Sequence, residues 1–162
     1  MFHKILINSR WRELNAVRII FAIYAIGFLY GTKNHIEDIL RDGLLGYHYV
    51  PFPVNLYWTL LTVLDPLAII FLVFLPFWGM TLSVWIMATD IAVNLSVAWY
   101  YDWPAGIFTD GRLGLQIAFG LFVFFTVPLA RRRIKKVMSS LPTFTLPIHC
   151  KFKKIGKKLS SP

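Results

Sequence analysis

Two aspartates, each in the middle of a long apolar run, constrain this chain more than any other feature. Residues 56–77 contain no charged side chain except Asp65, and residues 79–101 contain none except Asp90. A helix rises about 1.5 Å per residue, so each run is long enough to cross a hydrocarbon layer ~30 Å thick. Both runs are apolar all round, whereas a helix of a soluble core keeps a polar face. The sequence therefore predicts two consecutive membrane-spanning helices.

Two further apolar runs complete a set of four predicted spans, at about residues 14–31 and 113–130. The first has a short apolar core, which reaches the membrane thickness if Arg18 extends its charge to the headgroups. A cleaved signal peptide is the competing interpretation, but no small-residue cleavage site follows the core. The chain is 57% hydrophobic and only 15% charged, against ~25% charged residues in soluble domains. This composition predicts a polytopic membrane protein.

The predicted fold is all-α, an integral membrane four-helix bundle with a short amphipathic helix in the first outer loop. The membrane domain is expected to cover residues 1–131, and a basic cytoplasmic tail follows over residues 132–162. Apolar residues at positions 36, 39, 40, 44 and 45 have the spacing of a surface helix within the loop 32–54. Pro51 and Pro53 predict an extended run before the second span.

Lysine and arginine are concentrated near the two ends of the chain. Residues 1–18 hold 4 and residues 131–162 hold 10 of the 17. By the positive-inside rule, both termini are predicted to be cytoplasmic, in a multi-pass protein that we expect in a bacterial inner (plasma) membrane. The basic tail is interpreted either as a stop-transfer signal or as a patch held against the anionic lipid of the cytoplasmic leaflet. Nucleic acid is not a predicted partner, because no nucleic-acid-binding fold accompanies the charge.

An aspartate at mid-span costs roughly 2.5–3.5 kcal/mol on insertion scales, so two of them call for an explanation. The turn between the second and third spans is so short that these helices must be neighbours, which places Asp65 and Asp90 at one depth, facing each other. Other polar residues of the spans gather on the outer side of that depth, and together they predict a recess that opens outward. Its predicted ligand-binding residues are Asp65, Asp90, Asn94, Thr62, Tyr101, Gln116 and Tyr30.

Three interpretations of the intramembrane acids remain open. They form a recess for a ligand or substrate, they move protons or ions, or they serve only as hydrogen-bonding links between helices. Pro66 deprives the carbonyl of Thr62 of its helical partner, which predicts a kink beside Asp65. The chain has no P-loop, GxGxxG or HExxH motif. His35 and His48 match no tight ligand spacing, so no metal site is predicted, and no cofactor is indicated.

Three short motifs resemble those of the small DoxX-like and EXPERA-like four-helix membrane proteins. They are GFLYGTKNHI at the end of the first span, LTVLDPLAI around the acid of the second, and WYYDW after the third. The shared plan covers residues 14–130. Asp65 stands where an EXPERA-like pattern has glutamate, and the proline after it departs from that pattern. The resemblance implies a bundle that encloses a pocket for a small lipophilic molecule, but it names no reaction.

Two classes of function follow from these observations. In the first, the chain binds or processes a small lipophilic molecule in the recess, and the sequence leaves open whether it is an enzyme. In the second, it is an interaction protein, either an accessory subunit of a membrane complex or a toxin-immunity protein, and the acids serve only helix packing. A protein partner or a homo-oligomer is compatible with both classes. Transport is disfavoured, because four spans need an oligomer to form a pathway.

Overall fold

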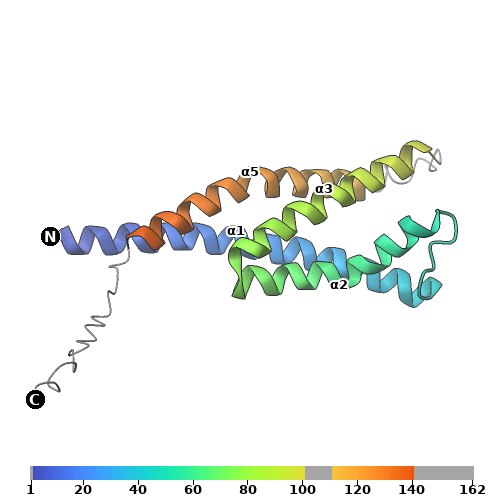
Figure 1. The fold of residues 1–162 in the computed structure, drawn as a ribbon, viewed down its shortest axis with the longest axis horizontal. Coiled ribbons are helices and arrows are strands. Elements are labelled where there is room, and N and C mark those ends of the chain that lie inside the picture. Colours follow the sequence, from blue (N-terminus) through green and yellow to red (C-terminus); the bar gives the residue numbers. More distant parts are fainter. Residues whose placement is uncertain (1, 101–110, 141–162) are drawn as a thin grey trace, which may run out of the picture.

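A computed structural model of the chain describes residues 2–100 and 111–140, and for residues 2–11 it describes the backbone alone. The described part is helical without a strand, which confirms the all-α prediction for these residues. Its helices are α1 (Phe2–Asp42), α2 (Phe52–Phe74), α3 (Pro76–Tyr100) and α5 (Arg112–Ser139) (Figure 1).

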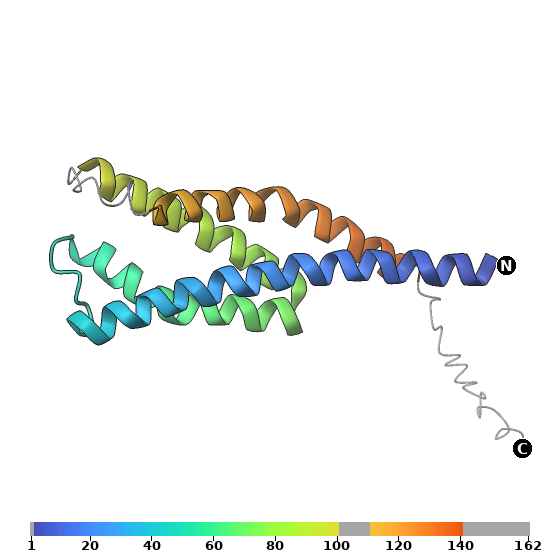
Figure 2. The ribbon, with the colours of Figure 1, turned by 180° about the vertical axis from the view of Figure 1, so that it is seen from behind.

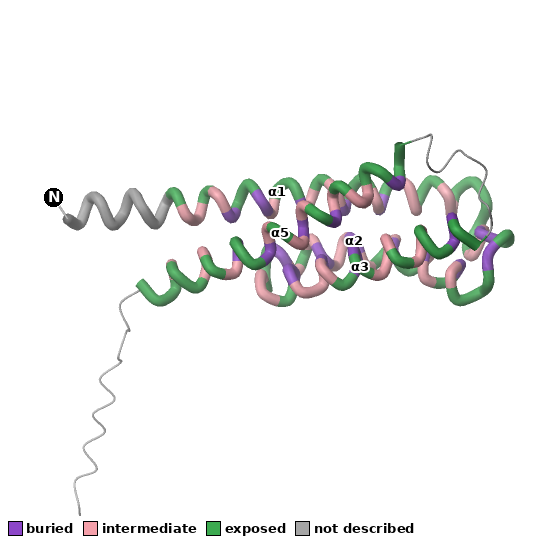
Figure 3. Tube along the Cα trace, turned by 90° about the horizontal axis from the view of Figure 1, so that it is seen from above, coloured by how far each residue is buried: buried purple, intermediate pink, exposed green. Residues whose placement is uncertain are grey.

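All four helices are long and apolar enough to cross a membrane, as the four apolar runs predict. Many of their large apolar side chains point away from the bundle: Ile19 is 62% exposed, Val73 69% and Phe125 76%. Such a surface is unfavourable in water but suits contact with acyl chains. Buried residues lie mainly where the helices face one another (Figure 3). The described helices are therefore compatible with a multi-pass membrane protein.

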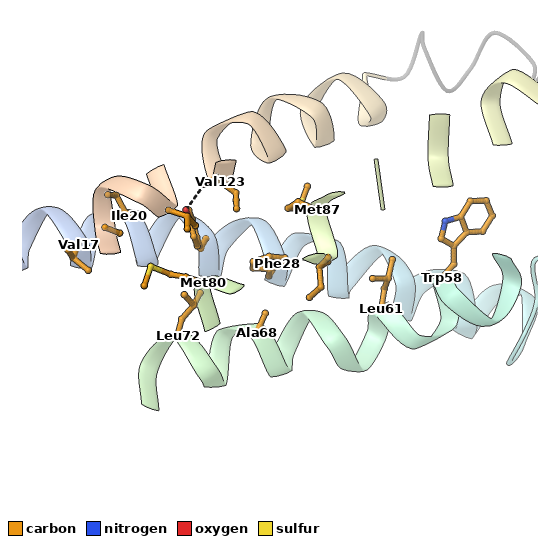
Figure 4. Packing of buried hydrophobic residues seen from close by; sticks show 14 of the residues in the cluster. Val17, Ile20, Phe28, Trp58, Leu61, Ala68, Leu72, Met80, Met87 and Val123 are labelled. Atoms are coloured by element: carbon orange, nitrogen blue, oxygen red, sulfur yellow. Dashed lines mark hydrogen bonds between the residues drawn. The ribbon is translucent and has the colours of Figure 1, made fainter. Parts of the chain in front are cut away.

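The helices pack as a ring in which each contacts two antiparallel neighbours. α1 packs against α2 and α5, and α3 packs against the same two helices (Figures 1 and 2). The side chains of Phe28, Leu61, Met80 and Val123 are almost completely buried at the centre (Figure 4). The side chain of Tyr24 is also fully buried. The Tyr24 hydroxyl donates to the carbonyl of Val123 at 3.1 Å, which satisfies its polar end inside the core. This bond joins α1 to its neighbour α5.

The turn between α2 and α3 is very short. Leu75 alone separates the two helices, and Pro76 opens α3, where its missing N–H has no helical partner to lose. Gly79 lies against the backbone of Phe71 and Leu72, so closely that an added Cβ would overlap those atoms. The lack of a side chain at Gly79 therefore permits the close approach of α2 and α3.

The separate amphipathic helix predicted in the first outer loop is wrong, because α1 continues without a break to Asp42. The sequence contains no helix breaker before that point, and ion pairs at helical spacing, such as Lys33–Glu37 at 2.7 Å, favour the helix. Gly43, with φ +86°, then ends it, and the loop up to α2 contains no helix. The apolar residues follow helical spacing as predicted, but positions 36, 39 and 40 belong to α1 and not to a separate helix.

Two other predicted boundaries also move. The extended run expected before the second span is replaced by helix, because α2 already begins at Phe52 and carries Pro53 in its first turn. Proline is tolerated there because the first helical N–H groups have no partner within the helix. At the other end, α5 continues to Ser139, so the start of the predicted basic tail is helical. The rest of that tail, residues 141–162, lies outside the described residues.

At one end of the bundle, α1 and α5 extend beyond the α2–α3 turn (Figures 1 and 2). Glu13 of α1 joins them there, since its carboxylate lies 3.0 Å from Arg133 Nη1 and 2.9 Å from Lys136 Nζ on α5. The basic segment that begins α1 and the one that ends α5 thus lie at the same end of the molecule. This arrangement is the one expected of a chain with four spans.

We expect Gly79→Ala to lower the free energy of unfolding of the protein in detergent by about 1–3 kcal/mol, the usual cost of overpacking, and so to lower its melting temperature. The added methyl group would meet backbone atoms of α2, which cannot rotate away as a flexible side chain can. Gly114→Ala is the matched control, because no atom lies within 4 Å of a Cβ at that position. Equal melting temperatures for the two variants would contradict the close approach of α2 and α3.

Candidate ligand-binding cavity

A cavity of about 840 Å³ lies between the helices, in the half of the bundle remote from the α2–α3 turn. All four helices and the loop between α1 and α2 form its wall. α1 contributes residues between Ile23 and Asp38, and the loop contributes Tyr47 and Tyr49. The remaining wall comes from Trp58 and Asp65 of α2, from residues between Ile86 and Asn94 of α3, and from residues between Arg112 and Phe119 of α5. A concave, largely apolar wall with a few polar groups is typical of small-molecule sites.

Asp90 of α3 belongs to a closed set of hydrogen bonds that joins α3 to α5. Asn94, one helical turn further on, donates from Nδ2 to Asp90 Oδ1 at 3.1 Å and to Gln116 Oε1 at 2.9 Å. Gln116 Nε2 donates in turn to Asp90 Oδ2. Both oxygens of Asp90 are therefore paired by side chains of the protein. Such polar contacts link helices in a layer where water is scarce.

Asp65 of α2 has a different environment. The residue is only 4% exposed, and within the described part of the chain no hydrogen bond reaches its carboxylate. Gly31 of α1 makes room for it, because a Cβ at position 31 would lie 2.6 Å from Asp65 Oδ2. A buried polar group without a partner loses its hydration and gains nothing in return. Since Asp65 lines the cavity, a bound molecule with a hydrogen-bond donor can supply the missing partner.

The loop between α1 and α2 covers part of the cavity through Tyr47. This residue is 7% exposed, and its hydroxyl donates to Asp38 Oδ2 at 3.0 Å and lies 3.4 Å from His35 Nδ1. Burial, and then the negative charge of Asp38, raise the pKa of the Tyr47 hydroxyl well above its usual range, so the group remains a hydrogen-bond donor. Asn55 of α2 donates from Nδ2 to the carbonyl of Leu45 at 2.7 Å. The loop is therefore attached to both α1 and α2.

Aromatic rings form much of the apolar wall. The ring of Trp58 packs edge-to-face against that of Tyr47, with centroids 4.9 Å apart. Phe119 of α5 packs in the same manner against Phe28 of α1, with centroids 5.5 Å apart. Gly27 permits this contact, since a Cβ there would overlap the ring of Phe119. Flat apolar surfaces therefore stand beside the polar groups of the cavity, an arrangement that suits an amphiphilic molecule.

The structure brings most of the predicted ligand-binding residues to this one cavity. Those that line it are Asp65, Asp90, Asn94, Gln116 and Tyr30. Thr62 is not among the lining residues, and its buried hydroxyl has no hydrogen-bond partner in the described part of the chain. Tyr101 lies outside the described residues.

The predicted set omitted Asn34, Asp38, Tyr47 and Arg112, which also line the cavity. For the two residues of α1 a signal exists in the sequence. With Gly31, they recur at intervals of three and four residues, which is one face of a helix that continues past the first span. Tyr47 offers no comparable signal, because the fold of the loop, not any local pattern, brings it to the cavity. Arg112 directly precedes the fourth apolar run, so it is not one of the polar residues within the spans.

Within the described ranges, no three or more His, Cys, Asp and Glu side chains gather as they would around a metal ion. Comparison with protein-family models, curated proteins and solved structures finds no match for the chain. The resemblance to DoxX-like and EXPERA-like proteins therefore rests on its short motifs and stays a prediction.

Replacement of the two intramembrane acids should affect stability differently. Asp90→Ala should lower the free energy of unfolding by about 1–3 kcal/mol, because it leaves the Gln116 amide without its acceptor and removes one of the two acceptors of Asn94 Nδ2. Asp65→Ala should leave it unchanged or raise it, because the substitution removes a buried polar group that has no donor. Thermal unfolding of both variants in one ligand-free detergent preparation measures the contrast. A loss at position 65 as large as that at position 90 would show that Asp65 has a structural partner.

Proposed function

We propose that this chain is a multi-pass membrane protein that binds a small lipophilic molecule in the cavity between its helices and orients it through Asp65. One observation carries the proposal: Asp65 is a buried carboxyl on the wall of a cavity of about 840 Å³, and no described residue donates to it. The other acids of the wall have partners. Asp90 is paired with Asn94, and Asp38 accepts from Tyr47. Among the described acids of the wall, Asp65 alone has its acceptors open.

The wall indicates what kind of molecule fits. A cavity of this size is within the ~300–1,000 Å³ range of small-molecule sites. Asp65 accepts hydrogen bonds, so the ligand needs a donor such as a hydroxyl or an amine at one end. Phe28, Trp58 and Phe119 offer apolar surface to the remainder of the ligand. An analogue without the donor would leave Asp65 unpaired and would bind more weakly.

We also propose an orientation of the bundle in the membrane. The basic segments of the chain are at one end of the bundle, so the positive-inside rule assigns that end, with both termini, to the cytoplasm. The cavity, which lies in the opposite half, then opens toward the outer face. The basic tail is held against the anionic lipid of the cytoplasmic leaflet. We assign the protein to a bacterial inner membrane.

An interaction protein is the second candidate, and the closed network at Asp90 favours it. That network is complete without a ligand, as expected if the acid serves only to join α3 and α5. The α1–α2 loop presents Leu44, 78% exposed, and Tyr49, 53% exposed, which a protein partner could contact. The partner would be a membrane complex, a toxin that this chain neutralises, or a second copy of the chain.

If the chain binds a lipophilic molecule, we expect Asp65→Asn to lose the bound molecule while the yield of folded protein stays unchanged. After purification in a mild detergent, organic extraction and mass spectrometry measure the co-purified molecule per protein. We expect a loss of occupancy of several-fold, because one hydrogen bond contributes about 0.5–1.5 kcal/mol net. Glu37→Gln is the matched control, since it is also an acid-to-amide change but lies on the exposed surface of α1, where Glu37 pairs only with Lys33.

Two outcomes would count against the proposal. If Asp65→Asn and Glu37→Gln retain the same molecule equally, Asp65 does not contact it. If no preparation contains a molecule, and substitutions in the loop 43–51 abolish the biological activity while Asp65→Asn does not, the chain is an interaction protein.

A further inference from the structure

A second and smaller cavity lies at the opposite end of the bundle, between α3 and α5, with a volume of about 360 Å³. Its apolar wall consists of Val84, Trp85, Phe124, Val127 and Pro128. Trp85 is 66% exposed, so the cavity reaches the outer surface of the bundle, which faces lipid. Its polar lining residues, Thr81 and Arg131, lie on the side toward the α2–α3 turn. The cavity is therefore an apolar groove with a cation at one end.

Arg131 is the charged group of this groove, and its pairing is incomplete. It donates from Nη2 to Thr81 Oγ1 at 2.6 Å, which fixes the guanidinium between α3 and α5. Its Nε is buried and has no hydrogen-bond partner, and among the described residues no carboxylate pairs with it. Arg133 and Lys136, a short distance along α5, both pair with Glu13 instead. Arg131 thus has a positive charge that no described carboxylate neutralises.

The contact with Thr81 also locates the charge relative to the membrane. Thr81 is five residues after Pro76 in α3, a rise of about 7 Å from the turn toward the middle of the bundle. The turn itself is apolar and exposed, with Phe74 at 75% and Trp78 at 67%. Side chains of this kind reside in the headgroup region rather than in water. Arg131 therefore lies at the level where headgroups meet acyl chains.

We infer that this groove is a binding site for one anionic phospholipid of the cytoplasmic leaflet. The lipid phosphate accepts hydrogen bonds from the Arg131 guanidinium, and an acyl chain lies along Trp85 and Phe124. The guanidinium has donors that no described acceptor uses, and a phosphodiester supplies both the acceptors and the opposite charge. The apolar wall distinguishes a lipid from a free anion, which would gain nothing from it. The site is specific to one arginine, unlike the diffuse attraction of the basic tail for a charged surface.

The experiment compares Arg131→Gln with Arg132→Gln. Arg132 is the next residue, is exposed and does not line the groove, so the two variants lose the same charge at nearly the same place. Delipidated full-length protein in neutral detergent is titrated with phosphatidylglycerol, with phosphatidylcholine and with inorganic phosphate. Native mass spectrometry counts bound lipid, and thermal unfolding reports stabilisation. For the wild type and Arg132→Gln we expect one retained phosphatidylglycerol, and for Arg131→Gln at least tenfold weaker binding.

Other outcomes overturn the inference. Equal losses in the two variants would mean a diffuse polybasic attraction, and equal stabilisation by inorganic phosphate would mean a site for a free anion. If Arg131→Gln does not fold, Thr81→Val decides instead, because it removes the hydrogen bond that positions the guanidinium and keeps its charge. A weaker affinity of Thr81→Val for phosphatidylglycerol supports the site, and an unchanged affinity excludes it.

Discussion

The pairing of polar groups inside an apolar layer is the constraint on which the rest of this structure depends. Water is not available there, so each polar side chain needs a partner from the protein. The hydroxyl of Tyr24 finds the carbonyl of Val123, that of Tyr57 meets Thr89 at 2.8 Å, and Asp90 is enclosed by amides. These contacts also join helix to helix. The carboxylate of Asp65 has no donor among the described residues, and an acceptor of this kind on a cavity wall is what a site for a donor-bearing ligand requires.

The continuity of α1 determines the shape of the cavity. Because the helix extends well past the first apolar run, Asp38 stands where it can accept from Tyr47 and so hold the loop over the cavity. At its other end, the same helix is joined to α5 through Glu13. The one helix α1 thus contacts both the loop that covers the cavity and the C-terminal end of α5.

Much of the fold could be predicted from the sequence, because it follows from length and hydrophobicity alone. The apolar runs predict the helices, and the short turn around Pro76 makes α2 and α3 neighbours, which brings Asp65 and Asp90 to one cavity. Local periodicity does not tell where a helix ends when no breaker intervenes, so the extent of α1 was missed. The contact of Gly31 with Asp65 depends on the packing register of α1 against α2, which no local pattern contains.

The α3–α5 interface is the element that the two cavities share. Remote from the α2–α3 turn it carries the network of Asp90 and Gln116, and near the level of that turn it carries the pair of Thr81 and Arg131. Between them, Gly120 of α5 lies so close to α3 that a Cβ there would overlap the side chain of Ile91. Closely packed helices move as rigid bodies and transmit displacement along their length. A lipid that joins α3 to α5 in the smaller cavity would therefore also hold the wall of the larger cavity in place.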